Sequence, residues 1–246
     1  MPRVFTRVGA VVLGGDFQGL GVLRSLGRQG VPTYLLDSGP CIGRFSRYTA
    51  GYRRCPNVRQ EGRFLSFLME LAREEDLGGW LLFPNDDETV RFLARHKLEL
   101  ERSYRVTTPP WEVVRFAYDK RLTYELAEGC GVAIPRTFYP RDVRDVEGLS
   151  MEFPVIIKPA VKEPFYHRTR KKAIPANNKS ELIKEFTRVA ELAGGCPLMV
   201  QELIPGGAKN LFSVGSLYKN GEFLGRVVAR RTRQHPMDFG HATTYA

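Results

Sequence analysis

Apolar residues in the first 110 positions recur with spacings that predict strands and helices in turn. Residues 8–13 and 31–37 are short apolar runs, typical of buried parallel strands. Between them, leucine and valine recur at near-helical spacing from Leu20 to Leu26, and Gly30 follows as a helix end would require. Strand, helix and strand within about 30 residues form a βαβ unit.

The alternation continues beyond this unit. Residues 64–73 have the pattern of an amphipathic helix, and residues 80–83 that of a buried strand. The polar segment 84–88 then opens a helix over 89–96. We therefore expect a doubly wound α/β region that closes near residue 109.

From residue 110 the pattern changes to short helices and strands, so we expect an α+β part rich in antiparallel strands. Residues 212–218 and 222–231 flank Asn220-Gly221, a strong hairpin signal. The other expected elements are two helices within 111–132, strands at 134–138, 153–159 and 198–204, and a helix from 178–182 to about Ala193 with Ser180 as its N-cap.

Composition indicates an ordinary globular chain. Of 246 residues, 43% are hydrophobic and 26% charged, and no apolar run is long enough to span a membrane. The first residues lack the pattern of a secretion signal. The four cysteines are widely spaced, which argues against a zinc site and a disulfide framework. We expect a cytoplasmic location.

The net charge of +10 raises the question of nucleic acid. Basic residues gather in two segments, 162–172 and 226–233, but the sequence has no helix-turn-helix, zinc-finger or RNP-type motif beside them. A basic cleft for phosphorylated small molecules explains the same charge. We therefore expect no specific nucleic-acid partner.

The segment GGDFQGLG, residues 14–21, follows the first strand and enters the first helix. A dinucleotide site needs G-x-G-x-x-G at this point and an acid after the next strand. Asp37 stands where that acid belongs, but the glycine spacing does not fit, and Asp16 places a negative charge where a pyrophosphate would bind. A tight turn between strand and helix, or a site for a non-phosphate ligand, remains open.

Three motifs follow one another in the second half: Tyr118-Asp119-Lys120, FPVIIKPA at 153–160, and VQELIPGG at 200–207. In this order and spacing they resemble the ATP-grasp superfamily, in particular predicted ATP-grasp proteins of the carboxylate–amine ligase kind. The resemblance implies a Rossmann-like pre-ATP-grasp domain at 1–109, a first nucleotide-holding subdomain at 110–205, and the start of a second subdomain at 206–246.

The resemblance also implies nucleotide-binding residues. Lys120 and Lys158 match the lysines on the phosphate side of ATP, each a point charge on a flexible stem. The connector that reads adenine matches Gln201, Glu202, Leu203 and Ile204. Lys120 in a solvated first helical turn, and Glu202 as an ordinary edge-strand carboxylate, are the plainer interpretations.

Where many family members have a glycine-rich flap, residues 161–173 contain no glycine. We expect a basic loop there, with Lys172 as the residue that reaches the phosphates, or a loop that is merely solvated.

In the segment 226–240, Arg231 and Arg233 share one face of an expected strand and suit a developing acyl phosphate or a substrate carboxylate. The acceptor substrate would be bound by Gly15, Asp16 and Asp238, with Asp16 paired to a substrate amine.

The family's magnesium ligands come late, as a glutamate and a Glu-x-Asn motif, and the sequence stops at Ala246 before either. We therefore expect an incomplete ATP-grasp fold, no assignable metal ligands, and a chain that is not a full enzyme on its own. The parent would use ATP and Mg²⁺ to make an acyl phosphate from a carboxylate and pass it to an amine or thiol, by positioning and charge neutralisation.

The expected partners are a small-molecule carboxylate and amine, with no membrane, and with a second copy of the chain as a further candidate. Two other functions remain open: an NAD(P)-binding oxidoreductase, which would depend on the first 40 residues, and a non-catalytic nucleotide-binding module.

Overall fold

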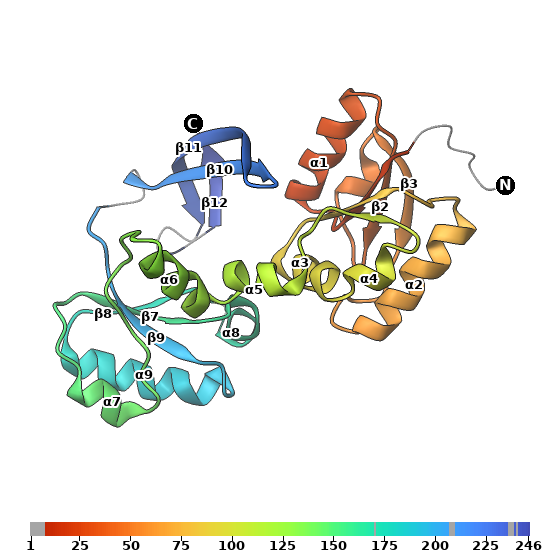
Figure 1. Cartoon of the computed structure of the whole chain (residues 1–246). Helices are drawn as coiled ribbons and strands as arrows, with labels where there is room; N and C mark the ends of the chain where they lie inside the picture. Colours follow the sequence, from red (N-terminus) through yellow and green to blue (C-terminus); the bar gives the residue numbers. More distant parts are fainter. Residues whose placement is uncertain (1–7, 170, 207–209, 236–238, 240) are drawn as a thin grey trace. The chain divides into compact units, whose positions relative to one another are not determined.

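The computed structural model describes residues 8–169, 171–206, 210–235, 239 and 241–246 (Figure 1). The chain divides into two compact units, Met1–Thr123 and Tyr124–Ala246. The expected boundaries at 109/110 and 205/206 stay predictions. No helix in the described ranges has the length and apolar character needed to cross a membrane.

A five-stranded parallel sheet forms the centre of the first unit, with the strand order β3-β2-β1-β4-β5. Parallel neighbours require crossover connections, which the helices supply. The strands are β1 (Ala10–Leu13), β2 (Thr33–Asp37), β3 (Thr49–Arg54), β4 (Leu81–Pro84) and β5 (Arg105–Val106); the helices are α1 (Phe17–Arg28), the short 3₁₀ helix η1 (Gly43–Phe45), α2 (Glu61–Glu74), α3 (Asp87–Arg95), α4 (Lys97–Leu100) and α5 (Trp111–Tyr118).

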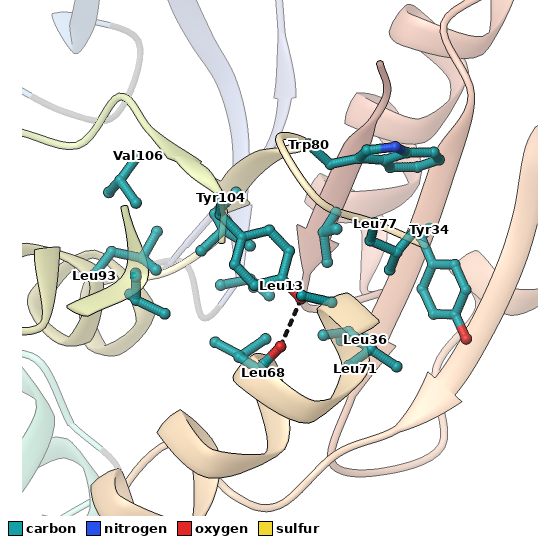
Figure 2. Packing of buried hydrophobic residues seen from close by; sticks show 14 of the residues in the cluster. Leu13, Tyr34, Leu36, Leu68, Leu71, Leu77, Trp80, Leu93, Tyr104 and Val106 are labelled. Atoms are coloured by element: carbon teal, nitrogen blue, oxygen red, sulfur yellow. Dashed lines mark hydrogen bonds between the residues drawn. The ribbon is translucent and has the colours of Figure 1, made fainter. Parts of the chain in front are cut away.

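Both faces of this sheet are packed because successive strand residues point to opposite sides. Val11 and Leu13 of β1 belong to a large apolar cluster with α2, whereas Val12 belongs to a second cluster with Leu23 of α1. Figure 2 shows the first cluster, in which the buried Tyr104 hydroxyl donates a hydrogen bond to the carbonyl oxygen of Leu68 over 2.8 Å. The βαβ pattern predicted from the sequence is therefore confirmed in type and order.

The sequence pattern did not predict β3. Its residues are half-buried or exposed, and it forms one edge of the sheet. Gly51 is needed there because a Cβ at this position would lie 2.4 Å from the ring of Tyr34 on β2. An edge strand of this kind has no apolar alternation to reveal it.

The second unit contains a four-stranded antiparallel sheet with the order β6-β9-β7-β8. Val155 and Ile157 of β7 and Val200 of β9 face an apolar core that α7, α8 and α9 complete. The elements are α6 (Lys120–Gly129), which begins in the first unit, then β6 (Thr137–Phe138), α7 (Val143–Gly148), β7 (Val155–Pro159), α8 (Lys162–Thr169), β8 (Ile174–Ala176), α9 (Lys179–Ala193) and β9 (Leu198–Glu202).

The predicted hairpin forms as β10 (Phe212–Lys219) and β11 (Glu222–His235), and β12 (His241–Tyr245) pairs with β11. Asn220 and Gly221 have φ of 54° and 82°. Positive φ at both central residues is what a type I′ turn requires, which explains the Asn-Gly signal.

Two local expectations were wrong. The basic segment expected as a loop contains α8, because Phe165 is fully buried in the core of the second unit and fixes this stretch against it. The N-cap of α9 is Asn178, not Ser180: the Asn178 side chain accepts a hydrogen bond from the backbone N–H of Glu181 over 2.9 Å. Asparagine and serine are about equally good caps, so only the position of the helix start decides between them.

Candidate functional site

The glycine turn, the start of the segment 14–21, allows β1 and α1 to pack closely. Gly14 has a φ of 104°, and a Cβ on Gly19 would lie 2.0 Å from the carbonyl oxygen of Gly14. Asp16 caps α1 by accepting hydrogen bonds from the backbone N–H groups of Gln18 and Gly19, over 3.0 and 3.2 Å. The negative charge that argued against a phosphate here thus stabilises the helix N-terminus.

Asp37, at the end of β2, closes the same turn. One of its carboxylate oxygens accepts from the backbone N–H of Gly15 over 2.7 Å, and the other accepts from Gly39 over 2.8 Å. The acid expected for a ribose hydroxyl therefore holds the glycine turn in place.

A pocket of about 190 Å³ lies at the carboxyl ends of β1, β2 and β4. In an open parallel sheet this is the edge at which ligands bind, at the point where the strand order reverses, here between β1 and β4. Among the residues that the structure describes, four acids line the pocket and no lysine or arginine does; the acids are Asp16, Asp37, Asp86 and Glu88.

The charge of this pocket is opposite to that of the chain as a whole. Glu88 is paired with Arg59 over 2.8 Å, but the polar side chains of the described pocket lining are carboxylates, amides, hydroxyls and the Cys55 thiol. Such a lining suits an ammonium or a neutral polar group and disfavours a phosphate.

Gly15 and Asp16, which the sequence singled out, line this pocket, and so does Asn85, which it did not. The Asn85 amide donates to Asp16 over 2.7 Å and so links the end of β4 to the glycine turn. The signal was present in the polar run that follows β4, which the sequence analysis interpreted only as a helix start.

In the second unit, Lys158 lies near the end of β7 on the sheet face opposite the α7–α9 core. The two flanking residues, Ile157 and Pro159, are buried, and Lys158 itself is half-buried. Its ammonium donates to the Tyr124 hydroxyl over 3.0 Å and lies 5.5 Å from the centroid of that ring. Tyr124, which the sequence analysis did not single out, therefore positions the lysine through a hydrogen bond and a cation–π contact.

Gln201 lies on the same face of this sheet. It pairs in register with Ile156, while Lys158 pairs with Met199, so Lys158 and Gln201 are diagonal neighbours on adjacent strands. Gln201 is only 3% exposed, and its amide donates to the Thr137 hydroxyl over 2.6 Å. A buried amide held in this way keeps a fixed orientation.

The connector after β9 has its backbone groups partly engaged. Glu202 exchanges hydrogen bonds with Arg136: its backbone N–H donates to the Arg136 carbonyl, and its carboxylate accepts from the Arg136 N–H over 2.9 Å. The Leu203 N–H donates to the Pro154 carbonyl over 3.2 Å. Ile204 is exposed, and its N–H has no hydrogen bond to another residue in the described ranges.

Lys120 begins α6 and belongs to the first unit, whereas Lys158 belongs to the second. Next to Lys120, Asp119 forms an ion pair with Arg121 over 2.6 Å. The pKa of the Asp119 carboxyl is lowered, mainly by the hydrogen bond from Arg121 and to a smaller extent by the charge of Lys120. The convergence of Lys120 and Lys158 on one triphosphate stays a prediction.

The other predicted cations have different surroundings. Lys172 is half-buried just after α8. On β11, Arg231 is half-buried and Arg233 exposed, and β-bulges on both sides of Arg233 interrupt the regular alternation on which their shared face depended. The Nε of Arg231 is buried and has no hydrogen-bond partner in the described part of the chain. Asp238 lies outside the described residues.

A metal site is absent from the ranges that the structure describes, where no three side chains of His, Cys, Asp or Glu gather closely enough to hold an ion.

The chain's similarity to known proteins is seen in its structure and not in its sequence. No family model matches the chain, and no curated protein matches it. Among solved structures, L-amino acid ligase from Bacillus licheniformis aligns over 96% of this chain and 53% of its own, with 13% identity and a TM-score of 0.71.

Two further structures were solved with nucleotides. N5-carboxyaminoimidazole synthetase from Staphylococcus aureus, complexed with ADP, aligns over 96% of this chain and 57% of its own, with 13% identity and a TM-score of 0.64. The biotin carboxylase domain of Hydrogenobacter thermophilus 2-oxoglutarate carboxylase, a dimer with MgADP, ADP and bicarbonate, aligns over 81% and 45%, with 16% identity and a TM-score of 0.58.

These structures define the class to which the fold belongs: the chain has an ATP-grasp fold. It spans about half the length of the structures that it matches.

Proposed function

We propose that this chain is the nucleotide-holding part of an ATP-dependent ligase that joins a carboxylate to an amine or thiol through an acyl phosphate. The ATP-grasp fold and the ADP-bound relatives support a nucleotide as ligand. The position of Lys158 carries the proposal, because a lysine that ends a buried strand and is held by Tyr124 projects a fixed positive charge from the sheet.

The chain's own residues would act by binding and neutralising charge. The Lys158 ammonium would contact the phosphates, with Lys120 and Lys172 as further cations. The connector Gln201 to Ile204 would hold the adenine, and the available N–H of Ile204 fits an acceptor on the base. The Leu203 N–H is already bonded within the sheet, so we assign Leu203 apolar contact only.

On β11, Arg231 and Arg233 would face the acyl phosphate or the substrate carboxylate. The buried Nε of Arg231 supports a role as an anion donor, since an unpartnered guanidinium N–H is costly to bury. When bound, Mg²⁺ would neutralise phosphate charge; its ligands are not among the residues assigned here.

The first unit would bind the acceptor. The acidic pocket beside Gly15 and Asp16 suits an amine, and Asp238 is kept as a proposed part of the same acceptor site. We further propose that residues 1–109 are a Rossmann-like pre-ATP-grasp domain, which the strand order 3-2-1-4-5 supports.

We also propose that residues 110–205 form the first nucleotide-holding subdomain and that a second subdomain begins at residue 206. The proposed location is the cytoplasm, and a second copy of the chain is a proposed partner. The comparisons do not favour the two alternatives, an NAD(P)-binding oxidoreductase and a non-catalytic nucleotide-binding module.

ATP binding to the purified chain, measured by calorimetry, tests this function. Lys158→Ala should weaken ATP at least about tenfold, equivalent to 1.4 kcal/mol or more. Lys184→Ala is the matched control, because Lys184 is an exposed lysine on α9 in the same unit. Equal affinities in both variants would remove Lys158 from the site, and tight binding of NAD(H) in place of ATP would favour the oxidoreductase.

A further inference from the structure

A second hollow in the first unit shares Asp16 and Asp37 with the acidic pocket. It is an open groove of about 470 Å³ with a mostly apolar lining. Its remaining lining residues are Phe17, Pro40, Cys41, Ile42, Arg44 and Phe45.

Three large apolar side chains of this groove are turned toward solvent. Phe17 at the start of α1 is 65% exposed, Ile42 just before η1 is 52% exposed, and Phe45 within η1 is 75% exposed. Single exposed apolar residues are common on protein surfaces, but three around one hollow form a patch that indicates a binding site.

The groove is fixed in shape by contacts with the glycine turn. The Gly43 N–H donates to the Gly15 carbonyl over 2.8 Å, and the Thr49 hydroxyl donates to the Gly43 carbonyl over 2.8 Å. A Cβ on Gly43 would lie 3.0 Å from both Leu23 and Leu35. The segment that carries Ile42 and Phe45 is therefore held in place before any ligand arrives, which lowers the entropy lost on binding.

The charge at the edge of the groove selects for a cation. One oxygen of Asp16 accepts three N–H donors, from Gln18, Gly19 and Asn85, whereas its other oxygen accepts no hydrogen bond from a described residue. The lining of the two hollows together contains four acids and one base, Arg44. The guanidinium of Arg44 lies 4.5 Å from the centroid of the Phe45 ring.

We infer that the groove and the acidic pocket together bind a primary amine with an apolar body, its ammonium at Asp16 and Asp37 and its apolar part against Phe17, Ile42 and Phe45. This inference deepens the proposed function, since the amine would be the acceptor of the ligase. An anion of the same shape is repelled by the two carboxylates, and an amine without an apolar body gains nothing from the groove.

Calorimetry on the full chain with three probes tests the assignment. 2-Phenylethylamine should bind; 3-phenylpropanoate, similar in size but negatively charged, should not; and methylamine, which keeps the ammonium but lacks the apolar body, should bind at least about tenfold more weakly than 2-phenylethylamine. Binding of the carboxylate as tight as that of the amine, or no binding of 2-phenylethylamine, would overturn the inference.

Variants separate the contribution of the Asp16 charge from that of the apolar side chains. Asp16→Asn keeps an N-cap but removes the charge, and should weaken 2-phenylethylamine about tenfold. Asp142→Asn, at the N-cap of α7, is its control. The double variant Phe17→Ser/Phe45→Ser should weaken the amine at least about fivefold, whereas Leu98→Ser, at a position 81% exposed on α4, should not. Equal effects of test and control variants would contradict the site.

ATP affinity measured in the same samples separates this inference from the proposed function. If the chain binds the amine but not ATP, the ligase proposal fails and the amine site remains. If it binds ATP but not the amine, only the amine site fails.

Discussion

The backbone N–H of Gly15 donates a hydrogen bond to the carboxylate of Asp37 over 2.7 Å and so joins the ends of β1 and β2. The two residues lie 22 positions apart. Because the other carboxylate oxygen accepts from Gly39, one side chain fixes both the glycine turn and the loop after β2. The wall shared by the acidic pocket and the apolar groove therefore depends on Asp37.

Asp37→Asn should destabilise the chain by about 2 kcal/mol, because an amide offers one acceptor where two backbone donors need partners. Urea unfolding measures this change. Asp76→Asn is the control, since Asp76 is exposed and has a φ of 54°, a conformation that asparagine tolerates. Equal unfolding free energies for the two variants would show that the Gly15 and Gly39 contacts contribute little.

The sequence predicted the elements whose residues carry their own pattern. The buried strands, the helices of the first unit and the hairpin at Asn220-Gly221 follow from apolar spacing and turn chemistry, both of which are local. The edge strand β3 and the helix α8 were not predicted, because Gly51 and Phe165 have meaning only against distant partners, such as Tyr34 for Gly51.

The residues of the candidate sites likewise divide into those with a local sequence signal and those that depend on distant contacts. Asp16 and Lys158 could be selected from the sequence because each follows an apolar strand. Asn85 also follows an apolar strand but was read only as part of a helix start, and Tyr124 carries no local signal, since its role comes from a contact with a residue more than 30 positions away. The apolar groove likewise arises from tertiary packing, which brings the segment around η1 against the glycine turn.

Capping of α9 gives a second prediction. Asn178→Ala should destabilise the chain by about 1 kcal/mol, because the Glu181 N–H loses its acceptor. Ser180→Ala should change stability by no more than about 0.5 kcal/mol, since Ser180 is exposed inside the helix, where alanine has the higher helix propensity. Chemical unfolding of both variants decides; a larger loss for Ser180→Ala would restore Ser180 as the cap.

The reactivity of the Cys55 thiol gives a third prediction. Burial, and to a smaller extent the charge of Asp37, raises the pKa of Cys55 from 9.0 to about 12. At about pH 8 only about 10⁻⁴ of this thiol is ionised, so alkylation of Cys55 should be slow and should rise about tenfold per pH unit up to pH 12. Cys130 is exposed and should react at least about 100-fold faster at pH 8, as measured by mass spectrometry of iodoacetamide-treated protein. Unfolding in urea is the control, because it should bring the two rates together; equal rates in the folded chain would contradict the raised pKa of Cys55.

Gly19 and Gly21 of α1 provide the sharpest stability test, because they lie two residues apart on one helix. A methyl group on Gly19 would lie 2.0 Å from the Gly14 carbonyl oxygen, a backbone atom that cannot rotate away, so Gly19→Ala should destabilise the chain by about 1–3 kcal/mol. Gly21 is exposed, and a methyl group there would meet no atom within 4 Å.

Gly21→Ala should therefore stabilise the helix by about 0.5–1 kcal/mol through its higher helix propensity. Thermal and urea unfolding of the two variants should shift in opposite directions. A shift in the same direction would mean that the glycine turn relaxes without cost. In that case Gly19 would not be what holds α1, and with it Asp16 and Phe17, at the mouth of the acidic pocket and the apolar groove.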